Sequence, residues 1–87
     1  GSIINAGAKI GRNCIINSKS LIEHDVVIGD HCHLATRSTV NGGVIIKKNS
    51  FIGSSSVIKQ NVKIGKNCFV NANLFIQKNL KDNSKVL

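Results

Sequence analysis

The stretch IEHDVVIGDHCHLATRSTV, residues 22–40, places an aliphatic side chain at every sixth position. The same spacing continues toward both ends of the chain, and every member of the series is aliphatic. An α-helix repeats at about 3.6 residues and a strand at about two, so neither produces this period. The members are Ile4, Ile10, Ile16, Ile22, Ile28, Leu34, Val40, Ile46, Ile52, Ile58, Ile64, Val70 and Ile76.

A second series follows four residues after the first and contains only small or apolar side chains. Within it, like residues recur every eighteen positions: Cys14 is followed by Cys32, and Val26 by Val44 and Val62. This pattern predicts an all-β fold, a parallel β-helix shaped as a triangular prism with hexapeptide repeats and roughly five coils. The members of the second series are Ala8, Cys14, Ser20, Val26, Cys32, Ser38, Val44, Ser50, Ser56, Val62, Cys68, Leu74 and Leu80.

Between the two inward positions the chain must turn, and two sets of turn-forming residues occur there. Glycine and asparagine tolerate a positive φ, and asparagine also hydrogen-bonds nearby backbone. We therefore expect asparagine to serve turn geometry here rather than glycosylation or catalysis. The first set is Gly11, Gly29, Gly53, Gly65, Asn5, Asn17, Asn41 and Asn71, and the second is Asn13, Asn49, Asn61, Asn67, Asn73 and Asn79.

The residue before each aliphatic member should point outward, because side chains alternate along a strand. Many of these outward positions are nevertheless apolar, and in steps of eighteen they form columns. An apolar stripe on a polar prism indicates a partner surface. We expect a homotrimer, because three-sided rods packed side by side close with cyclic symmetry. The two columns are Ile15-His33-Phe51-Phe69 and Leu21-Thr39-Val57-Phe75.

The chain has 87 residues and a net charge of +8, and its length indicates one small domain. The charge suggests an anionic partner: nucleic acid, a phosphorylated metabolite or a membrane surface. Three phenylalanines form no stacking platform for single strands. We therefore expect no nucleic acid among its partners. No apolar run is long enough to span a membrane, so we expect a cytoplasmic protein without a membrane partner. The three cysteines lie in the inward series and are expected to be packed thiols.

One stretch departs from the regular repeat and contains all three histidines. In it, Glu23-His24-Asp25 is followed by His31 and His33 and then by Gly42-Gly43. By the eighteen-residue period, Gly42 stacks over His24 and Gly43 over Asp25, leaving room for a ligand and exposing backbone N–H groups. Acyl transfer needs such a pair: a general base, and donors for the developing oxyanion. The sequence therefore predicts His24 as the base. Glu23 and Asp25 are expected to fix its tautomer.

Two lysines continue upward from this cluster. Lys59 is predicted two coils above Glu23, and Lys78 three coils above His24, where they would meet the phosphates of a bound cofactor. His33 lies in an apolar column and is expected to be a neutral hydrogen-bond partner, either structural or ligand-binding. The spacing of the histidines places them on different sides, so no metal site is expected within one chain; a metal shared between subunits stays open.

The residues Ile22-Glu23-His24-Asp25, Ile28-Gly29-Asp30, His33-Leu34 and Gly42-Gly43-Val44 resemble the hexapeptide-repeat acyltransferases, among them sialic acid O-acetyltransferases and bacterial amino-sugar N-acetyltransferases. The resemblance implies a left-handed coil, a trimer with sites between neighbouring prisms, and acetyl-coenzyme A as acyl donor. It implies His24 as general base assisted by Asp25. It also implies contacts from His33 and the Gly42 backbone to the acetyl and pantetheine end, with Ser54 further along.

On this basis residues 1–81 are expected to form the β-helix acyltransferase domain and residues 82–87 a C-terminal tail. The resemblance also implies that relatives commonly carry an N-terminal sugar-binding domain, and we expect it to be absent here. The expected function is acetyl transfer to a sugar hydroxyl or amino group, with a sugar or nucleotide-sugar as acceptor. The alternative is a non-catalytic β-helix that serves as a trimerisation or scaffold module, or a truncated inactive fragment.

Overall fold

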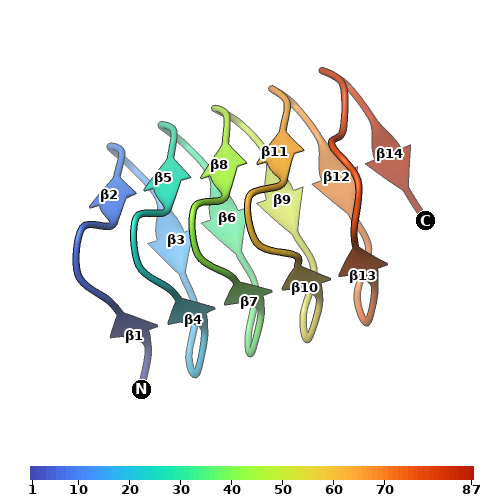
Figure 1. Ribbon diagram of the computed structural model, residues 1–87. Helices are drawn as coiled ribbons and strands as arrows, with labels where there is room; N and C mark the ends of the chain where they lie inside the picture. Colours follow the sequence, from blue (N-terminus) through green and yellow to red (C-terminus); the bar gives the residue numbers. More distant parts are fainter.

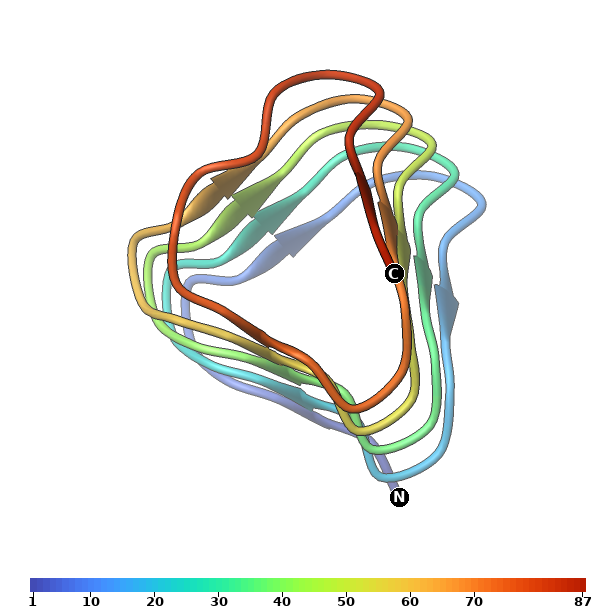
Figure 2. The ribbon, with the colours of Figure 1, turned by 90° about the vertical axis from the view of Figure 1, so that its right-hand side faces the viewer.

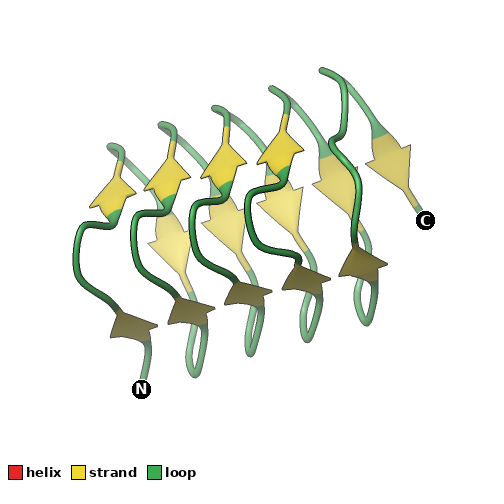
Figure 3. Ribbon diagram, in the orientation of Figure 1, coloured by secondary structure: helices red, strands yellow, loops and turns green.

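The computed structural model describes all 87 residues as fourteen strands of two residues each, with no helix (Figures 1 and 3). Each strand is one short side of a triangular coil, and a turn of four residues or more follows it. The strands are β1 Ile3–Ile4, β2 Lys9–Ile10, β3 Ile15–Ile16, β4 Leu21–Ile22, β5 Val27–Ile28, β6 His33–Leu34, β7 Thr39–Val40, β8 Ile45–Ile46, β9 Phe51–Ile52, β10 Val57–Ile58, β11 Lys63–Ile64, β12 Phe69–Val70, β13 Phe75–Ile76 and β14 Lys85–Val86.

The strands stack into three parallel sheets, one on each face of a prism (Figure 1). Face A has the order β1-β4-β7-β10-β13, face B β2-β5-β8-β11, and face C β3-β6-β9-β12-β14. Partners in register are eighteen residues apart, as in Ile22 with Val40. In Figure 2 the chain winds clockwise as the coils approach the viewer, so the coil is left-handed. The predicted fold, with about five coils, is confirmed.

Both inward series line the interior of the prism. The aliphatic series is fully buried from Ile22 to Val70, and cysteine or serine occupies the small positions beside it. These small side chains donate hydrogen bonds to carbonyl groups of the next coil: Cys32 Sγ lies 3.2 Å from the Lys47 oxygen, and Ser50 Oγ lies 2.8 Å from the Gly65 oxygen. Burial raises the pKa of the Cys32 thiol. The cysteines are free thiols packed in one column, as expected.

The turns use glycine differently from our expectation. Positive φ values occur at the second set, as in Asn13 and Asn49, together with Gly7 and Gly43. The first-set glycines have ordinary φ values, but a Cβ at Gly53 would lie 2.5 Å from backbone atoms of Asn71 and Ala72 in the next coil. They are therefore required for the close approach of neighbouring coils.

Asp30 caps a turn in the neighbouring coil. Its Oδ1 accepts a hydrogen bond of 2.7 Å from the Arg12 backbone N–H, and the Arg12 guanidinium lies 3.6 Å from Oδ2. That backbone hydrogen bond and, to a lesser degree, the charges of Arg12 and His31 lower the pKa of the carboxyl group. Asp30 thus supports the coil at the edge between faces B and C and takes no part in the site predicted around His24.

The last coil is two residues shorter than the others. Leu80 bridges to Ile64, sixteen residues earlier, so it takes the place of the aliphatic series and not the Val62 column to which the period assigned it. The strand β14 then pairs with β12. Residues 82–87, which we expected to form a tail, therefore continue face C. A constant period could not show this, because the deletion falls inside a turn.

The apolar outward columns are confirmed. On face C, His33 pairs in register with Ile15 and Phe51, and Phe51 pairs with Phe69. The two phenylalanine rings stack with centroids 5.1 Å apart, and Phe69 is 38% exposed. No helix is present that is long and apolar enough to cross a membrane.

Replacing Gly53 by alanine should destabilise the protein by about 1–3 kcal/mol, because the added methyl group meets backbone atoms that cannot swing aside. Denaturant unfolding measures this loss. Gly42→Ala is the matched control, since its Cβ would meet only the side chain of His24. Equal stability losses for the two variants would contradict the assignment of Gly53 to coil spacing.

Candidate active site

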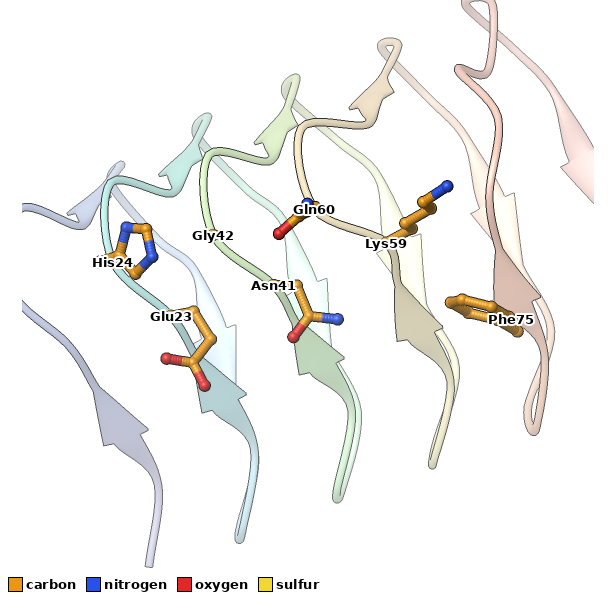
Figure 4. A pocket seen from close by; sticks show the side chains of 7 residues that line it. All are labelled: Glu23, His24, Asn41, Gly42, Lys59, Gln60 and Phe75. Atoms are coloured by element: carbon orange, nitrogen blue, oxygen red, sulfur yellow. The ribbon is translucent and has the colours of Figure 1, made fainter.

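A hollow of about 360 Å³ runs along the edge between faces A and B, over the turns that follow β4, β7 and β10 and beside β13 (Figure 4). Because coils stack in register, residues eighteen apart form short columns along it. Phe75 is its only apolar side chain. The lining residues are Glu23, His24, Asn41, Gly42, Lys59, Gln60 and Phe75.

His24 and Asp25 form a pair at one end of this hollow. His24 Nδ1 lies 3.2 Å from Asp25 Oδ2, and the two side chains are 70% and 73% exposed. Asp25 occupies the left-handed turn position, with φ at 59°, which aspartate tolerates better than most residues. If Nδ1 donates its proton to Asp25, the lone pair of Nε2 is available to accept one.

Two glycines flank the pair and make room for it. A Cβ at Gly42, one coil above, would lie 2.8 Å from His24 Nε2 and Cε1. A Cβ at Gly7, one coil below, would collide with the Asp25 carboxylate. The positions of Gly42 and Gly7 therefore allow the imidazole and the carboxylate to lie flat over neighbouring backbone. The eighteen-residue period predicted Gly42 next to His24, and the same count places Gly7 next to Asp25, which we did not expect as part of the site.

Only one of the two glycine N–H groups expected over His24 is free. The Gly43 N–H donates to the His24 carbonyl oxygen at 3.1 Å, whereas the Gly42 N–H makes no hydrogen bond. A Cβ at Gly43 would collide with the side-chain oxygen of Asn61 in the following coil, and its φ of 72° is one that glycine adopts without strain. The expectation of a two-donor surface is corrected to a single donor at Gly42.

Glu23 lines the hollow but does not orient His24. Its Oε1 accepts a hydrogen bond of 2.7 Å from Asn5 Nδ2, and it makes no hydrogen bond to the imidazole. The expectation that Glu23 helps to fix the tautomer is therefore wrong for this structure. Asp25 alone contacts the ring, because the left-handed turn brings it back beside His24.

Of the two lysines predicted along the edge, only Lys59 lines the hollow. Lys78 lines a neighbouring hollow of about 270 Å³ at the C-terminal end, and Phe75 lines both hollows. Ile76 still pairs in register with Ile58, and the last coil loses its two residues between Ile76 and Leu80, in the turn that contains Lys78. A contact of Lys78 with the phosphates of a cofactor stays a prediction.

His33 and Ser54 lie elsewhere on the prism. His33 is in β6 on face C, opposite the edge between faces A and B that carries His24. Its ring packs edge-on to Phe51 with centroids 5.0 Å apart, and its Nε2 lies 3.1 Å from Asn17 Nδ2, an amide that can donate to it. Ser54 is exposed in the turn between β9 and β10. Within one chain, neither residue reaches the hollow.

Three lining residues were not predicted from the sequence as parts of the site: Asn41, Gln60 and Phe75. Gln60 lies eighteen residues after Gly42, so the period that placed Lys59 could also have found it. Phe75 was assigned only to an apolar column. No group of three or more histidine, cysteine, aspartate or glutamate side chains lies close enough together to hold a metal ion within one chain.

Solved structures share this fold. The chain is similar to a histidine-to-alanine variant of GDP-perosamine N-acetyltransferase from Caulobacter crescentus, in complex with CoA and GDP-perosamine, at a TM-score of 0.85 and 17% identity. It is also similar to the acetyltransferase domain of PglB from Neisseria gonorrhoeae in complex with acetyl coenzyme A, at a TM-score of 0.80 and 22% identity. These matches cover 97% and 98% of this chain but only 49% and 44% of theirs, about half their length.

These neighbours confirm, as a likeness of fold, the resemblance to hexapeptide-repeat sugar acetyltransferases. A comparison with curated proteins finds no match. The family described as GMPPB C-terminal domain matches residues 1–86, which is nearly the whole chain. The chain therefore belongs to the GMPPB C-terminal domain family.

Proposed function

We propose that this chain is an acetyl-coenzyme A-dependent acetyltransferase that acts on a hydroxyl or amino group of a sugar or nucleotide-sugar. The observation that carries the proposal is the His24–Asp25 pair, which opens into a hollow beside the free N–H of Gly42. Two structures of the same fold contain CoA or acetyl coenzyme A, which supports this choice of acyl donor.

In the proposed reaction His24 is the general base. Its Nε2 takes the proton from the acceptor hydroxyl, or from the amine as it attacks the thioester carbonyl carbon. The C–S bond then breaks, and the imidazolium returns the proton to the leaving thiolate. Asp25 holds the imidazole through Nδ1 and stabilises its positive charge while the proton is present.

The free N–H of Gly42 is the proposed donor to the carbonyl oxygen as negative charge develops on it. A donor that is not already hydrogen-bonded can meet the oxyanion without first losing a partner. No protein nucleophile is required, because the thiols of Cys32 and Cys68 are buried and the hollow contains no cysteine. Transfer is therefore direct, without an acyl-enzyme intermediate.

We assign the phosphate-bearing part of the donor to the Lys59 end of the hollow. Lys59 is exposed and two coils above Glu23, so its backbone lies about 10 Å further along the axis at the spacing of neighbouring strands. Gln60 and Phe75 beside it offer an amide and an apolar ring to the pantetheine chain.

We further propose that the active form is a homotrimer in the cytoplasm. Apolar columns on faces A and C would be covered by neighbouring prisms. Because His33 lies opposite His24 on one chain, the ring available to a site between prisms is His33 of the partner subunit, with the partner's Ser54 further along. Three free cysteines fit a reducing compartment.

The competing proposal is a non-catalytic β-helix that serves as a trimerisation or scaffold module. It is favoured by the regular stacking and the apolar columns, which require no chemistry. It does not account for a histidine and an aspartate placed between two glycines at one end of a hollow. Binding of acetyl-coenzyme A separates the two proposals, because a scaffold has no reason to bind it.

Replacing His24 by asparagine should lower kcat for thiol release from acetyl-coenzyme A with an amino-sugar or sialic acid acceptor by about 100-fold or more. Acetyl-coenzyme A should still raise the Tm of the variant, because a ligand that binds only the folded state stabilises it. The matched control is His31→Asn, at a left-handed turn position where other turns carry asparagine. An unchanged rate in the His24 variant would exclude the proposed base.

Replacing Gly42 by alanine should preserve folding but displace the imidazole, because the methyl group would occupy the space of His24 Nε2. We expect a loss of about tenfold or more in kcat/KM, since general-base catalysis requires the nitrogen within hydrogen-bond reach of its proton. Circular dichroism melting checks the fold, and steady-state kinetics checks the site. Full activity with an unchanged melting curve would show that the imidazole of His24 does not act as the general base from its position next to Gly42.

Replacing Phe69 by serine should weaken the trimer, because the side chain belongs to the apolar column of face C. Analytical ultracentrifugation should show a shift toward monomer, and activity should fall with it. Val27→Ser is the matched control: Val27 is 40% exposed on face B, close to the 38% of Phe69, and lies outside both predicted columns. A wild-type chain that sediments as a monomer would refute the proposed assembly.

A further inference from the structure

Six exposed lysines gather on the last three coils, at and beside the edge between faces B and C (the upper loops toward the C-terminal end in Figure 1). Four lie in the turns after β8 and β11 and before β14, and the other two lie in the flanking strands, Lys63 in β11 on face B and Lys85 in β14 on face C. None forms an ion pair, since the only ion pair between fully charged side chains joins Arg12 to Asp30, and His24 pairs with Asp25. We call this set the lysine ridge: Lys47, Lys48, Lys63, Lys66, Lys81 and Lys85.

On this edge, the positive charge is balanced by an acidic side chain in the first two coils but not in the last three. At the N-terminal end Arg12 lies 3.6 Å from the Asp30 carboxylate. At the C-terminal end the only acid is Asp82, whose Oδ1 accepts a backbone hydrogen bond of 2.8 Å from Lys66. The ridge therefore holds six positive charges against one negative charge, more than half of the net charge of +8.

The lysine ridge is separate from the hollow that carries His24. The hollow follows the edge between faces A and B, and its lysine, Lys59, belongs to that edge. Coils are about 4.8 Å apart, so the ridge extends about 10 Å along the axis. Six like charges in so small an area repel one another, and an anionic surface would relieve that repulsion.

The chemistry of the ridge favours a flat anionic surface over a nucleic-acid strand. Its cations are all lysines, which bind as point charges, whereas arginine provides the bidentate fork suited to individual phosphates. The hollow that carries His24 lies on another edge, and the C-terminal hollow reaches the ridge only at Leu80 and Val86, so no groove runs along all three turns of the ridge to guide a strand. The nearest aromatic rings, Phe51 and Phe69, stack on each other, and Phe51 also packs against His33. They offer little open ring surface to bases.

We propose that the lysine ridge binds the headgroups of anionic phospholipids and holds the prism on a membrane surface with its axis parallel to the bilayer. Clusters of four to eight basic residues are typical of such peripheral binding. The sequence-based expectation of no membrane partner rested on the lack of a spanning segment, which peripheral binding does not require. In this orientation the edge with His24 points away from the lipid and stays open to solvent.

The test is co-sedimentation of the full chain with vesicles of phosphatidylcholine alone or with 30% phosphatidylglycerol, in about 0.1 M salt. We expect binding only to the anionic vesicles. The ridge variant replaces Lys47, Lys48, Lys66 and Lys81 by glutamine, and the control replaces Lys9, Lys19, Lys59 and Lys78, for the same loss of charge. Each lysine removed should lower the affinity for anionic vesicles about fivefold, so the ridge variant should bind them several hundredfold more weakly than the wild type. The control variant should lose much less affinity.

Equal losses in the two variants would overturn the proposal, because net charge and not the ridge would then govern binding. Failure of the wild-type chain to bind anionic vesicles would overturn it as well. So would a DNA oligonucleotide, single-stranded or duplex, that binds the ridge more tightly than the vesicles do at the same salt concentration. Melting curves confirm that both variants are folded, and acetylation plays no part in the readout.

Discussion

The register between coils is the constraint on which the rest of this structure depends. Each strand contributes only two residues, so no strand is stable alone, and each must pair with the strand eighteen residues away. Pairing repeats the same side-chain environment in every coil. Aliphatic residues therefore recur inside, while cysteine and serine recur where a donor can reach the carbonyl group of the next coil.

Close spacing of the coils also explains where glycine is required. At Gly53 and its equivalents, backbone from the next coil occupies the space of a Cβ. At Gly7 and Gly42 the occupant is a side chain, the carboxylate of Asp25 or the imidazole of His24. The same absence of a side chain thus serves packing in one column and the candidate site in another. The difference is whether the neighbouring coil presents a backbone or a functional group.

The regular stack gives each edge of the prism its own chemistry. One edge carries the histidine, the aspartate and a hollow, and another carries the lysine ridge. Because residues of one column are about 4.8 Å apart along a straight axis, an edge suits a long ligand or a flat surface better than a compact one. The apolar columns on faces A and C complete this division, since they suit contact with neighbouring prisms.

The coil, the inward residues and the stacking of Gly42 on His24 could all be predicted from the sequence, because each follows from counting in eighteens along a constant period. Departures from that period and the choice of hydrogen-bond partners became visible only in the folded chain. The two-residue deletion in the last coil moved Leu80 from the Val62 column into that of the aliphatic series. Hydrogen bonds bound Glu23 to Asn5 and the Gly43 N–H to the His24 carbonyl, leaving Asp25 and Gly42 beside the imidazole. The partner that each polar group selects depends on side-chain and turn conformation, which the period does not record.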